Sequence, residues 1–433
     1  MKYSSLNRQS ESINFETATI KGQATDKGLY FPEHIPVLPT TFFNQMESLS
    51  DEEIALQVIA PYVEDVIPMA VLKDIVASTV HFPMPLEPVS TGVVALELFH
   101  GNTLAFKDIG ARFMSRCLGY FVRNNNQKVT VLVATSGDTG GAVADGFYGV
   151  DGVEVIILYP SGKVSTVQEQ QLTTLGNNII ALEVDGNFDD CQRMVKMAFN
   201  DPTVIGQLFL TSANSINVAR WLPQQFFYFL AYKQWADKHQ PPVISVPSGN
   251  FGNICAGLLA HQSGLPVKHF IAACNANDVV PQYMQSQHYA AKQSVATISN
   301  AMDVGDPSNF VRILALFQNE YQSLTNIFSS VSITDAETKQ AIQEVFTNHQ
   351  YLMDPHGAVG FVALQKYLQA HPHEKGIFVE TAHPVKFFDV VEPIINEKIA
   401  IPPAIQSIMH KTKQAIPIGA QYEDLQAFLL SRR

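Results

Sequence analysis

The chain has 433 residues, enough for two or three packed units rather than one. Apolar residues make up 46% and charged residues 16%, a charged share below the usual value of roughly a quarter, which argues against a disordered chain. With 28 basic and 40 acidic side chains the net charge is −12, a field that repels phosphate backbones and argues against nucleic acid as a partner.

The cysteines and the first residues bear on metal binding and on the cellular compartment of the protein. The four cysteines show neither a CxxC pair nor the His/Cys spacing of a zinc site, so we expect reduced, buried thiols and no metal. The first residues, MKYSSLNRQSESINF, lack the apolar core of a secretory signal. No uncharged apolar run reaches the roughly 18 residues of a membrane span. These features predict a cytoplasmic protein without a membrane partner.

Residues 1–80 are predicted to form a small N-terminal domain. Helix-forming residues dominate stretches such as Glu52–Ala60, and the sequence GLYFP predicts a turn at 28–32. Pro83 and Pro85 mark the passage to the rest of the chain, residues 81–433.

From about residue 90 the pattern becomes strand, tight polar loop and helix in repeated order. Short β-branched runs predict strands at Val129–Val133, Val153–Leu158, Ile179–Val184, Val243–Val246, Phe270–Ala273 and Ile377–Val379. Helix-length segments such as Asp190–Phe199 and Val218–Trp235 lie between them, and short helices are expected from about residue 390. This alternation predicts an α/β fold with buried, mostly parallel sheets, whose ligands sit at the carboxyl ends of strands.

Two glycine-rich loops share one design. ATSGDTGG (134–141) follows the strand VTVLV, PSGNFGN (247–253) follows the strand VISV, and each opens a helix. Such a turn offers free backbone N–H groups and the positive end of a helix dipole, which favour an anion. An ordinary strand-to-helix turn is the alternative. Neither loop matches GxGxxG or GxxxxGK[ST], which disfavours a dinucleotide or nucleoside triphosphate site.

A third motif surrounds a lysine, in the stretch HGNTLAFKD (100–108). Lys107 has TLAF before it and IG two residues after it. Apolar neighbours can desolvate a lysine and lower its pKa, which makes the amine a nucleophile toward a carbonyl and then a base. A solvated surface charge is the alternative for a lone lysine.

The ordered set HGNTLAFKD, ATSGDTG, SANSIN (212–217) and PSGNFGN resembles the signature of threonine synthases, a family of fold-type II pyridoxal-phosphate enzymes. GLYFP (28–32), DGNFDDC (185–191), NAMDV (300–304) and TAHPVKF (381–387) extend the resemblance over nearly the whole chain. It implies two open, mostly parallel α/β units with the cofactor between them, plus the N-terminal domain. Asn102 stands where the family usually has proline, which predicts a less rigid loop before Lys107.

The resemblance also implies the cofactor contacts. Lys107 matches the lysine that bonds covalently to pyridoxal phosphate, and Thr381 matches the hydroxyl that bonds its pyridine nitrogen. The segment that matches the phosphate-binding loop consists of Ser248, Gly249, Asn250, Phe251, Gly252 and Asn253. Asp138 stands close to the cofactor ring, where we expect it to share a proton with the ring oxygen.

The remaining predicted contacts concern the substrate. The loop that matches the grip on the substrate carboxylate contains Thr135, Ser136, Gly137 and Thr139. The substrate phosphate needs cations and hydroxyls. The candidates are Lys163, Ser215, Asn217 and Arg220, with Arg112 as a further cation and a surface salt bridge as the alternative for each basic residue. Asp303 and His356 lie in family-like stretches and are either substrate contacts or structural.

The resemblance implies a lyase that turns O-phosphohomoserine and water into threonine and phosphate, the last step of threonine biosynthesis. Lys107 would serve as covalent anchor and as general acid and base. The alternatives are the same fold with serine or threonine dehydration or β-replacement, a phosphate- or nucleotide-binding protein without catalysis, and a silent scaffold. Either a monomer or a homodimer is compatible with the sequence.

Overall fold

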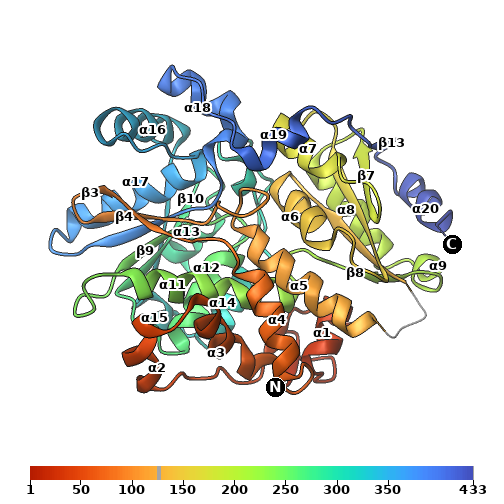
Figure 1. Cartoon of the computed structure of the whole chain (residues 1–433), viewed down its shortest axis with the longest axis horizontal. Helices are drawn as coiled ribbons and strands as arrows, with labels where there is room; N and C mark the ends of the chain where they lie inside the picture. Colours follow the sequence, from red (N-terminus) through yellow and green to blue (C-terminus); the bar gives the residue numbers. More distant parts are fainter. Residues whose placement is uncertain (124–127, 433) are drawn as a thin grey trace. The chain divides into compact units, whose positions relative to one another are not determined.

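The computed structural model describes residues 1–123 and 128–432, and the chain divides into two compact units (Figure 1). The first unit comprises Met1, Phe31–Phe106 and Trp221–Ala400, and the second comprises Lys2–Tyr30, Lys107–Arg220 and Ile401–Arg433. Each unit is therefore assembled from segments that are distant in sequence, and one crossing falls between Phe106 and Lys107. The division at residue 80 stays a prediction.

A six-stranded sheet forms the centre of the first unit, in the order β11-β10-β9-β12-β4-β3. Only the pairing of β3 with β4 is antiparallel, and the other neighbours run parallel. The strands are β3 (Leu86–Ser90), β4 (Val93–Glu97), β9 (Val243–Pro247), β10 (His269–Cys274), β11 (Phe328–Ser332) and β12 (Gly376–Glu380). All residues of β9 and β12 are buried, as expected for parallel strands covered on both faces.

The first unit contains several helices. They are α2 (Thr40–Gln45), α3 (Asp51–Val63), α4 (Met69–Thr79), α11 (Phe226–Gln234), α12 (Gly252–Gln262), α13 (Val279–Ser286), α14 (Phe310–Leu316), α15 (Tyr321–Thr325), α16 (Asp335–His349), α17 (Pro355–Ala370) and α18 (Phe388–Ile395). Helix α17 packs on β9 and β12, and α16 packs on α17 (Figure 1). Leu364 of α17 and Phe378 of β12 belong to the resulting apolar core.

The second unit is built on a five-stranded parallel sheet in the order β13-β7-β6-β5-β8. Its strands are β5 (Val129–Ala134), β6 (Val153–Pro160), β7 (Ile179–Val184), β8 (Phe209–Thr211) and β13 (Ile416–Ile418). Its helices are α1 (Phe15–Lys21), α5 (Lys107–Val122), α6 (Asp138–Phe147), α7 (Thr166–Thr173), α8 (Phe188–Ala198), α9 (Pro202–Ile205), α19 (Pro403–Met409) and α20 (Tyr422–Leu430). Helices α8 and α20 pack together, and α8 packs on β5 and β6 (Figure 1).

The predicted α/β fold and its six predicted strands are confirmed, and two local predictions are wrong. The continuous helix expected over Val218–Trp235 is α10 (Val218–Trp221), a 3₁₀ turn at Leu222–Gln225 and α11. Pro223 lies in the 3₁₀ turn and lacks the N–H that a continuous helix needs. The turn expected at 28–32 lies earlier, at 25–27, and Tyr30–Pro32 form the short strand β2.

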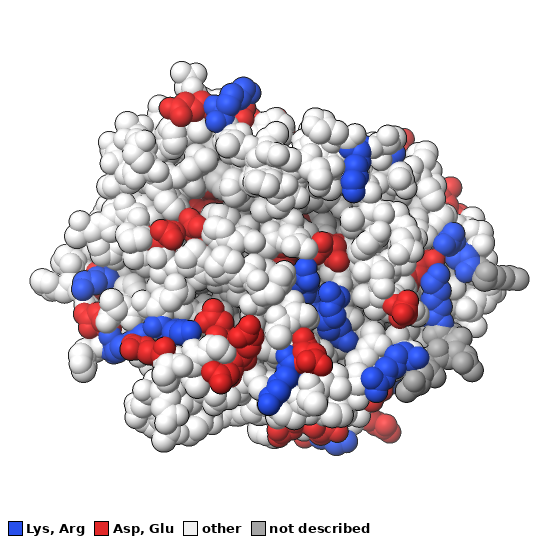
Figure 2. All heavy atoms as spheres, viewed as in Figure 1, with Lys and Arg blue, Asp and Glu red and all other residues white. Residues whose placement is uncertain are grey.

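The four cysteines are buried thiols, as predicted. Acidic and basic side chains are interspersed on the face drawn in Figure 2. None of the helices within residues 1–123 and 128–432 combines the length and the hydropathy needed to cross a bilayer.

Candidate functional site

Lys107 and Asp138, which were predicted from separate motifs, lie together in the second unit. Lys107 is the first residue of α5 and Asp138 the first residue of α6. Lys107 Nζ is 3.8 Å from Asp138 Oδ2, and the two side chains are 19% and 4% exposed. Opposite charges at this distance in a mostly buried setting attract each other, so the carboxylate fixes the place of the amine.

The loop after β5 is folded around the hydroxyl of Thr135. Thr135 Oγ1 accepts the N–H groups of Gly137 (3.0 Å) and Gly140 (2.8 Å) and is buried by them. In contrast, the N–H groups and hydroxyls of Ser136 and Thr139 form no hydrogen bond with any residue that the structure describes. Thr135 therefore shapes the loop, while Ser136 and Thr139 keep polar groups available for a ligand. The predicted contact of this loop with a substrate carboxylate stays a prediction.

Gly137 allows a close approach of α7 to this loop. Its φ of +133° lies where side chains are strained, and a Cβ there would stand 2.3 Å from Gln168 Cδ. Gln168 uses this space to donate its Nε2–H to Asp138 Oδ1, at 2.9 Å. The glycine thus lets Gln168 hold one carboxylate oxygen of Asp138 while the other oxygen lies on the side of Lys107.

The second glycine-rich loop joins β9 to α12 in the first unit. Its base is closed by Asn253 Nδ2, which donates to the carbonyl oxygen of Pro247 at 2.8 Å. Ser248 donates its N–H to Ala273 and its hydroxyl to Val246, so both groups face the sheet. At Gly249 a Cβ would lie 2.6 Å from Met302 Cα, so only glycine fits.

The N–H groups of this loop are mostly uncommitted. Those of Gly249, Phe251, Gly252 and Asn253 donate to no acceptor in the described part of the chain. Phe251 has a φ of +61°, the left-handed conformation that turns successive N–H groups toward one concavity. Together with the amino end of α12, these donors form a cup suited to a phosphate.

Thr381 follows β12 and is linked to the residue before Lys107. Phe106 donates its N–H to the carbonyl oxygen of Thr381 at 2.9 Å. The Thr381 side chain is buried, and its hydroxyl forms no hydrogen bond within residues 1–123 and 128–432. A buried hydroxyl without a protein partner is suited to bond a ligand atom.

Beside Thr381 in the sequence, Glu380 belongs to a fully buried polar cluster with Asp354 and His356. Asp354 Oδ1 is 2.5 Å from His356 Nδ1, and His356 Nε2 accepts the N–H of Ala301 at 3.2 Å. Because Nε2 accepts a hydrogen bond, Nδ1 is the ring nitrogen that donates to Asp354. His356 therefore has a structural role between Asp354 and the turn at Ala301.

The two carboxyl groups of this cluster differ in charge. Burial and the neighbouring Asp354 raise the pKa of Glu380 well above its usual value. Burial opposes ionisation of Asp354 too, but the electrostatic attraction of His356 and the hydrogen bonds that Asp354 accepts from it keep the pKa of Asp354 below the usual value. The pair therefore holds one proton, on Glu380, and one negative charge, on Asp354.

The predicted substrate-phosphate residues separate into internal and exposed ones. Arg220 is buried and donates from Nη1 to the carbonyl oxygen of Ala213 at 2.5 Å. Burial lowers the pKa of Arg220 to about 10, and Asp108 opposes that shift. Asn217 is fully buried and donates to the carbonyl oxygens of Thr19 and Ser212.

Lys163 is exposed and forms no ion pair within the described residues. It follows β6, which is the parallel neighbour of β5, so it stands at the same sheet edge as Ser136 and Thr139. Ser215 is partly exposed, and Arg112 Nη2 lies 3.7 Å from Asp145 Oδ2. Asp303 accepts hydrogen bonds from Asn275, Asn277 and Thr297, which makes it a structural anchor.

Sequence reasoning missed several polar residues around the site. Gln168 holds Asp138, and the fully buried Lys386 donates from Nζ to the carbonyl oxygen of Thr103 at 2.8 Å. Asn309 and Arg312, described below, contact the loop at 248–253. Lys386 lies in the motif TAHPVKF and could have been found there, whereas the other three carry no local signal.

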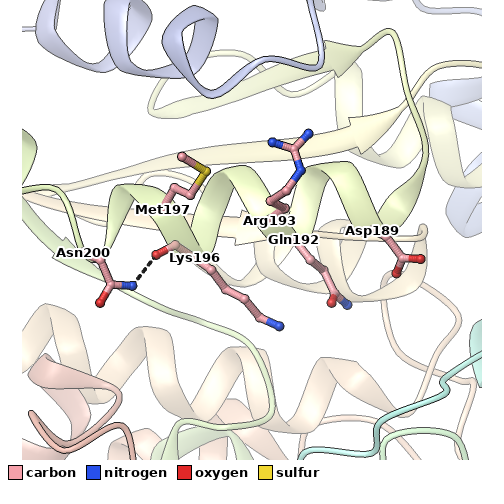
Figure 3. Close-up of a pocket in the computed structure, with 6 residues that line it drawn as sticks. All are labelled: Asp189, Gln192, Arg193, Lys196, Met197 and Asn200. Atoms are coloured by element: carbon pink, nitrogen blue, oxygen red, sulfur yellow. Dashed lines mark hydrogen bonds between the residues drawn. The ribbon is translucent and has the colours of Figure 1, made fainter. Parts of the chain in front are cut away.

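A separate hollow lies on the exposed side of α8 (Figure 3). It is lined by Asp189, Gln192, Arg193, Lys196, Met197 and Asn200. None of these is a predicted site residue. One helix supplies nearly the whole lining, so the hollow offers no converging polar groups.

Comparison with known proteins agrees with the geometry. Residues 83–380 match the family model described as pyridoxal-phosphate dependent enzyme, and residues 2–80 and 357–429 match the models of the threonine synthase N terminus and C-terminal part. A threonine synthase from Haemophilus influenzae is 41% identical over 99% of this chain and 100% of its own length.

Two solved structures are similar over essentially the whole chain. Threonine synthase from Escherichia coli has a TM-score of 0.94 and 40% identity, and covers 100% of both chains. The PLP-bound threonine synthase from Brucella melitensis has a TM-score of 0.92 and 32% identity, over 99% of this chain and 98% of its own. The chain belongs to the threonine synthase family of pyridoxal-phosphate-dependent enzymes.

Proposed function

We propose that the chain converts O-phosphohomoserine and water into threonine and phosphate, with pyridoxal phosphate bonded to Lys107. The observation that carries this is the partly buried amine of Lys107 beside Asp138, in a chain of the threonine synthase family. Either a monomer or a homodimer would fit this activity.

The residues present fit the cofactor. The uncommitted N–H groups of Gly249, Phe251, Gly252 and Asn253 would hold its phosphate, and the hydroxyl of Thr381 would bond its pyridine nitrogen. A hydroxyl does not keep that nitrogen protonated, in contrast to a carboxylate. When bound, the cofactor supplies an electron sink for the α-carbon of the substrate.

Lys107 Nζ is the group that moves protons in this proposal. When it is not bonded to the cofactor, the amine of Lys107 would take the proton from Cα of the substrate and later return it. Loss of a Cβ proton accompanies departure of phosphate from Cγ, and water then adds its hydroxyl at Cβ. Threonine and inorganic phosphate account for all atoms of the ester and the water.

Asp138 is proposed to share a proton with the ring oxygen of the cofactor. The side chain is 4% exposed, and Gln168 Nε2 donates to its Oδ1. A buried carboxylate next to an anionic oxygen is costly unless a proton lies between them. Asp138 would in this way also decide how strongly Lys107 Nζ is held.

For the substrate itself, we propose that Ser136 and Thr139 bind the carboxylate and that Lys163 binds the phosphate. The uncommitted groups of Ser136 and Thr139 and the exposed amine of Lys163 stand at one sheet edge. Arg220 and Asn217 would instead stabilise the backbone near this edge, because their side chains donate to backbone carbonyl oxygens.

The test is to mix cofactor-loaded protein with O-phosphohomoserine and to measure phosphate and threonine together, beside Lys107→Ala. Equal amounts of both products, lost in the variant, support the proposal. Phosphate without threonine would retain the elimination and contradict the addition of water. If neither product forms from protein that shows the absorbance of bound cofactor, the substrate assignment is wrong.

A further inference from the structure

The loop at 248–253 is held by side chains at the start of α14. Ser308 donates its N–H to Asn250 Oδ1 at 2.6 Å. Asn309 Nδ2 donates to the carbonyl oxygen of Asn250 at 3.1 Å, and the Asn309 N–H reaches the same oxygen at 3.4 Å. The rings of Phe251 and Phe310 pack edge to face with centroids 5.9 Å apart. Both backbone and side chain of Asn250 are therefore fixed by the segment 308–310.

Arg312, which is fully buried, determines how Asn309 is oriented. Arg312 Nη1 donates to Asn309 Oδ1 at 2.7 Å, and the guanidinium lies over the ring of Trp221 at 4.6 Å from its centroid. A guanidinium has only donors, so it must face the oxygen of the Asn309 amide. The NH₂ group of that amide is then left to face the carbonyl oxygen of Asn250. Charge-assisted bonds of this kind are stronger than neutral ones.

The orientation of the Asn250 carbonyl sets the direction of one N–H in the cup. The carbonyl oxygen of Asn250 and the N–H of Phe251 belong to the same peptide, and in a planar trans peptide they point in opposite directions. Holding the carbonyl toward Asn309 therefore turns the Phe251 N–H to the other side, where no acceptor lies among the described residues. The left-handed conformation of Phe251 is strained and persists only where its surroundings enforce it.

We propose that Arg312 and Asn309 are positioning residues for the cofactor phosphate, because they turn the 250–251 peptide so that the Phe251 N–H donates to a phosphate oxygen. This inference rests on the proposed function, which takes the loop at 248–253 as the phosphate site. The positive charge of Arg312 also polarises the hydrogen-bonded chain through Asn309 to this peptide, which strengthens the final N–H donor. Burial lowers the pKa of Arg312 to about 10, so the side chain remains charged at neutral pH.

The experiment compares two cofactor forms. Protein stripped of cofactor is titrated with pyridoxal phosphate and with pyridoxal, which has the same ring and aldehyde but no phosphate. Arg312→Met removes the charge and the donor at similar length, and Asn309→Asp places a carboxylate against the Asn250 carbonyl. In both variants we expect the affinity for pyridoxal phosphate to fall about tenfold to a hundredfold, the loss that follows from one charge-assisted bond. The affinity for pyridoxal should change less than about threefold. The ³¹P resonance of bound pyridoxal phosphate should shift in both variants.

Val345→Ala is the matched control. Val345 is a buried residue of α16, 3% exposed, and its truncation weakens core packing without removing a contact of Asn250. The control should lower the melting temperature and leave the ratio of the two affinities unchanged. If Arg312→Met and Asn309→Asp lower the affinities for pyridoxal phosphate and pyridoxal equally, or lower neither, the inference is overturned while the assignment of the phosphate loop stands. A wild-type protein that binds both ligands equally would overturn the assignment of the loop as well.

Discussion

Replacing Glu380 with glutamine should stabilise the folded protein relative to the wild type, and this stabilisation should grow as the pH rises. Burial raises the folded-state pKa of Glu380 well above its usual value of 4.5, so the folded state keeps a proton that the unfolded state releases. The contribution of this group to the free energy of unfolding is therefore fully present below the unfolded pKa and is lost as the pH rises toward the folded pKa. The loss is about 1.4 kcal/mol per pH unit inside that window. Glutamine stays neutral and keeps an N–H that can donate to Asp354.

The free energy of unfolding of Glu380→Gln minus that of the wild type should thus grow by about 1.4 kcal/mol between pH 5 and pH 6. Urea unfolding followed by circular dichroism at several pH values in this interval measures the difference. Glu337→Gln is the control: hydrogen bonds with Lys366 and Thr334 lower the pKa of Glu337 to about 2, so both of its states are ionised above pH 5. The difference in the free energy of unfolding between Glu337→Gln and the wild type should be constant from pH 5 to pH 6. Parallel curves for Glu380→Gln and the wild type from pH 5 to pH 6 would refute a proton on Glu380.

Three further changes test the second unit. Asp138→Asn should shift the absorbance maximum of the bound cofactor and the pH dependence of that maximum, and the control Asp145→Asn should leave both unchanged. If the spectrum and the rate of Asp138→Asn equal those of the wild type at every pH, the shared proton is contradicted. Gly137→Ala should cost about 1–3 kcal/mol of stability in thermal unfolding, because it combines a positive φ with a clash against Gln168, and an unchanged melting temperature would show that the loop tolerates a Cβ. Lys163→Met should raise the KM for O-phosphohomoserine about tenfold with little change in kcat. The control is Lys128→Met, which removes a lysine that is paired with Glu154. If the two variants have the same KM, Lys163 does not belong to the phosphate site.

Strands and glycine-rich loops could be predicted because their signals are local. Runs such as Val153–Leu158 are continuous and β-branched, and parallel strands buried on both faces require that composition. The loop at 247–253 is recognised by its glycines, and the structure shows at Gly249 that no room exists for a side chain. Lys107 was found by its apolar neighbours and its motif, and the structure places its amine beside Asp138.

Long-range contacts explain what the sequence could not show. Arg220 and Asn217 are predicted as ligand residues because they lie in a family-like motif. The structure adds that both side chains donate to backbone carbonyls inside the fold, and their contact with a ligand stays a prediction. Conversely, Arg312 is linked to Asn250 through Asn309, which lies about 60 residues after that loop in sequence. A single sequence gives no indication of which polar side chain will be oriented by another.

The course of the chain between the units has a consequence for synthesis on the ribosome. The sheet of the second unit is begun by β5 at residue 129 and is completed at one edge only when β13, Ile416–Ile418, pairs with β7. Most of the chain between β8 and α19, the segment Trp221–Ala400, belongs to the other unit, so its 180 residues emerge while that edge stays open. Open strand edges pair readily with other chains. We therefore expect the nascent protein to expose this strand edge to other chains until its last strand has left the exit tunnel.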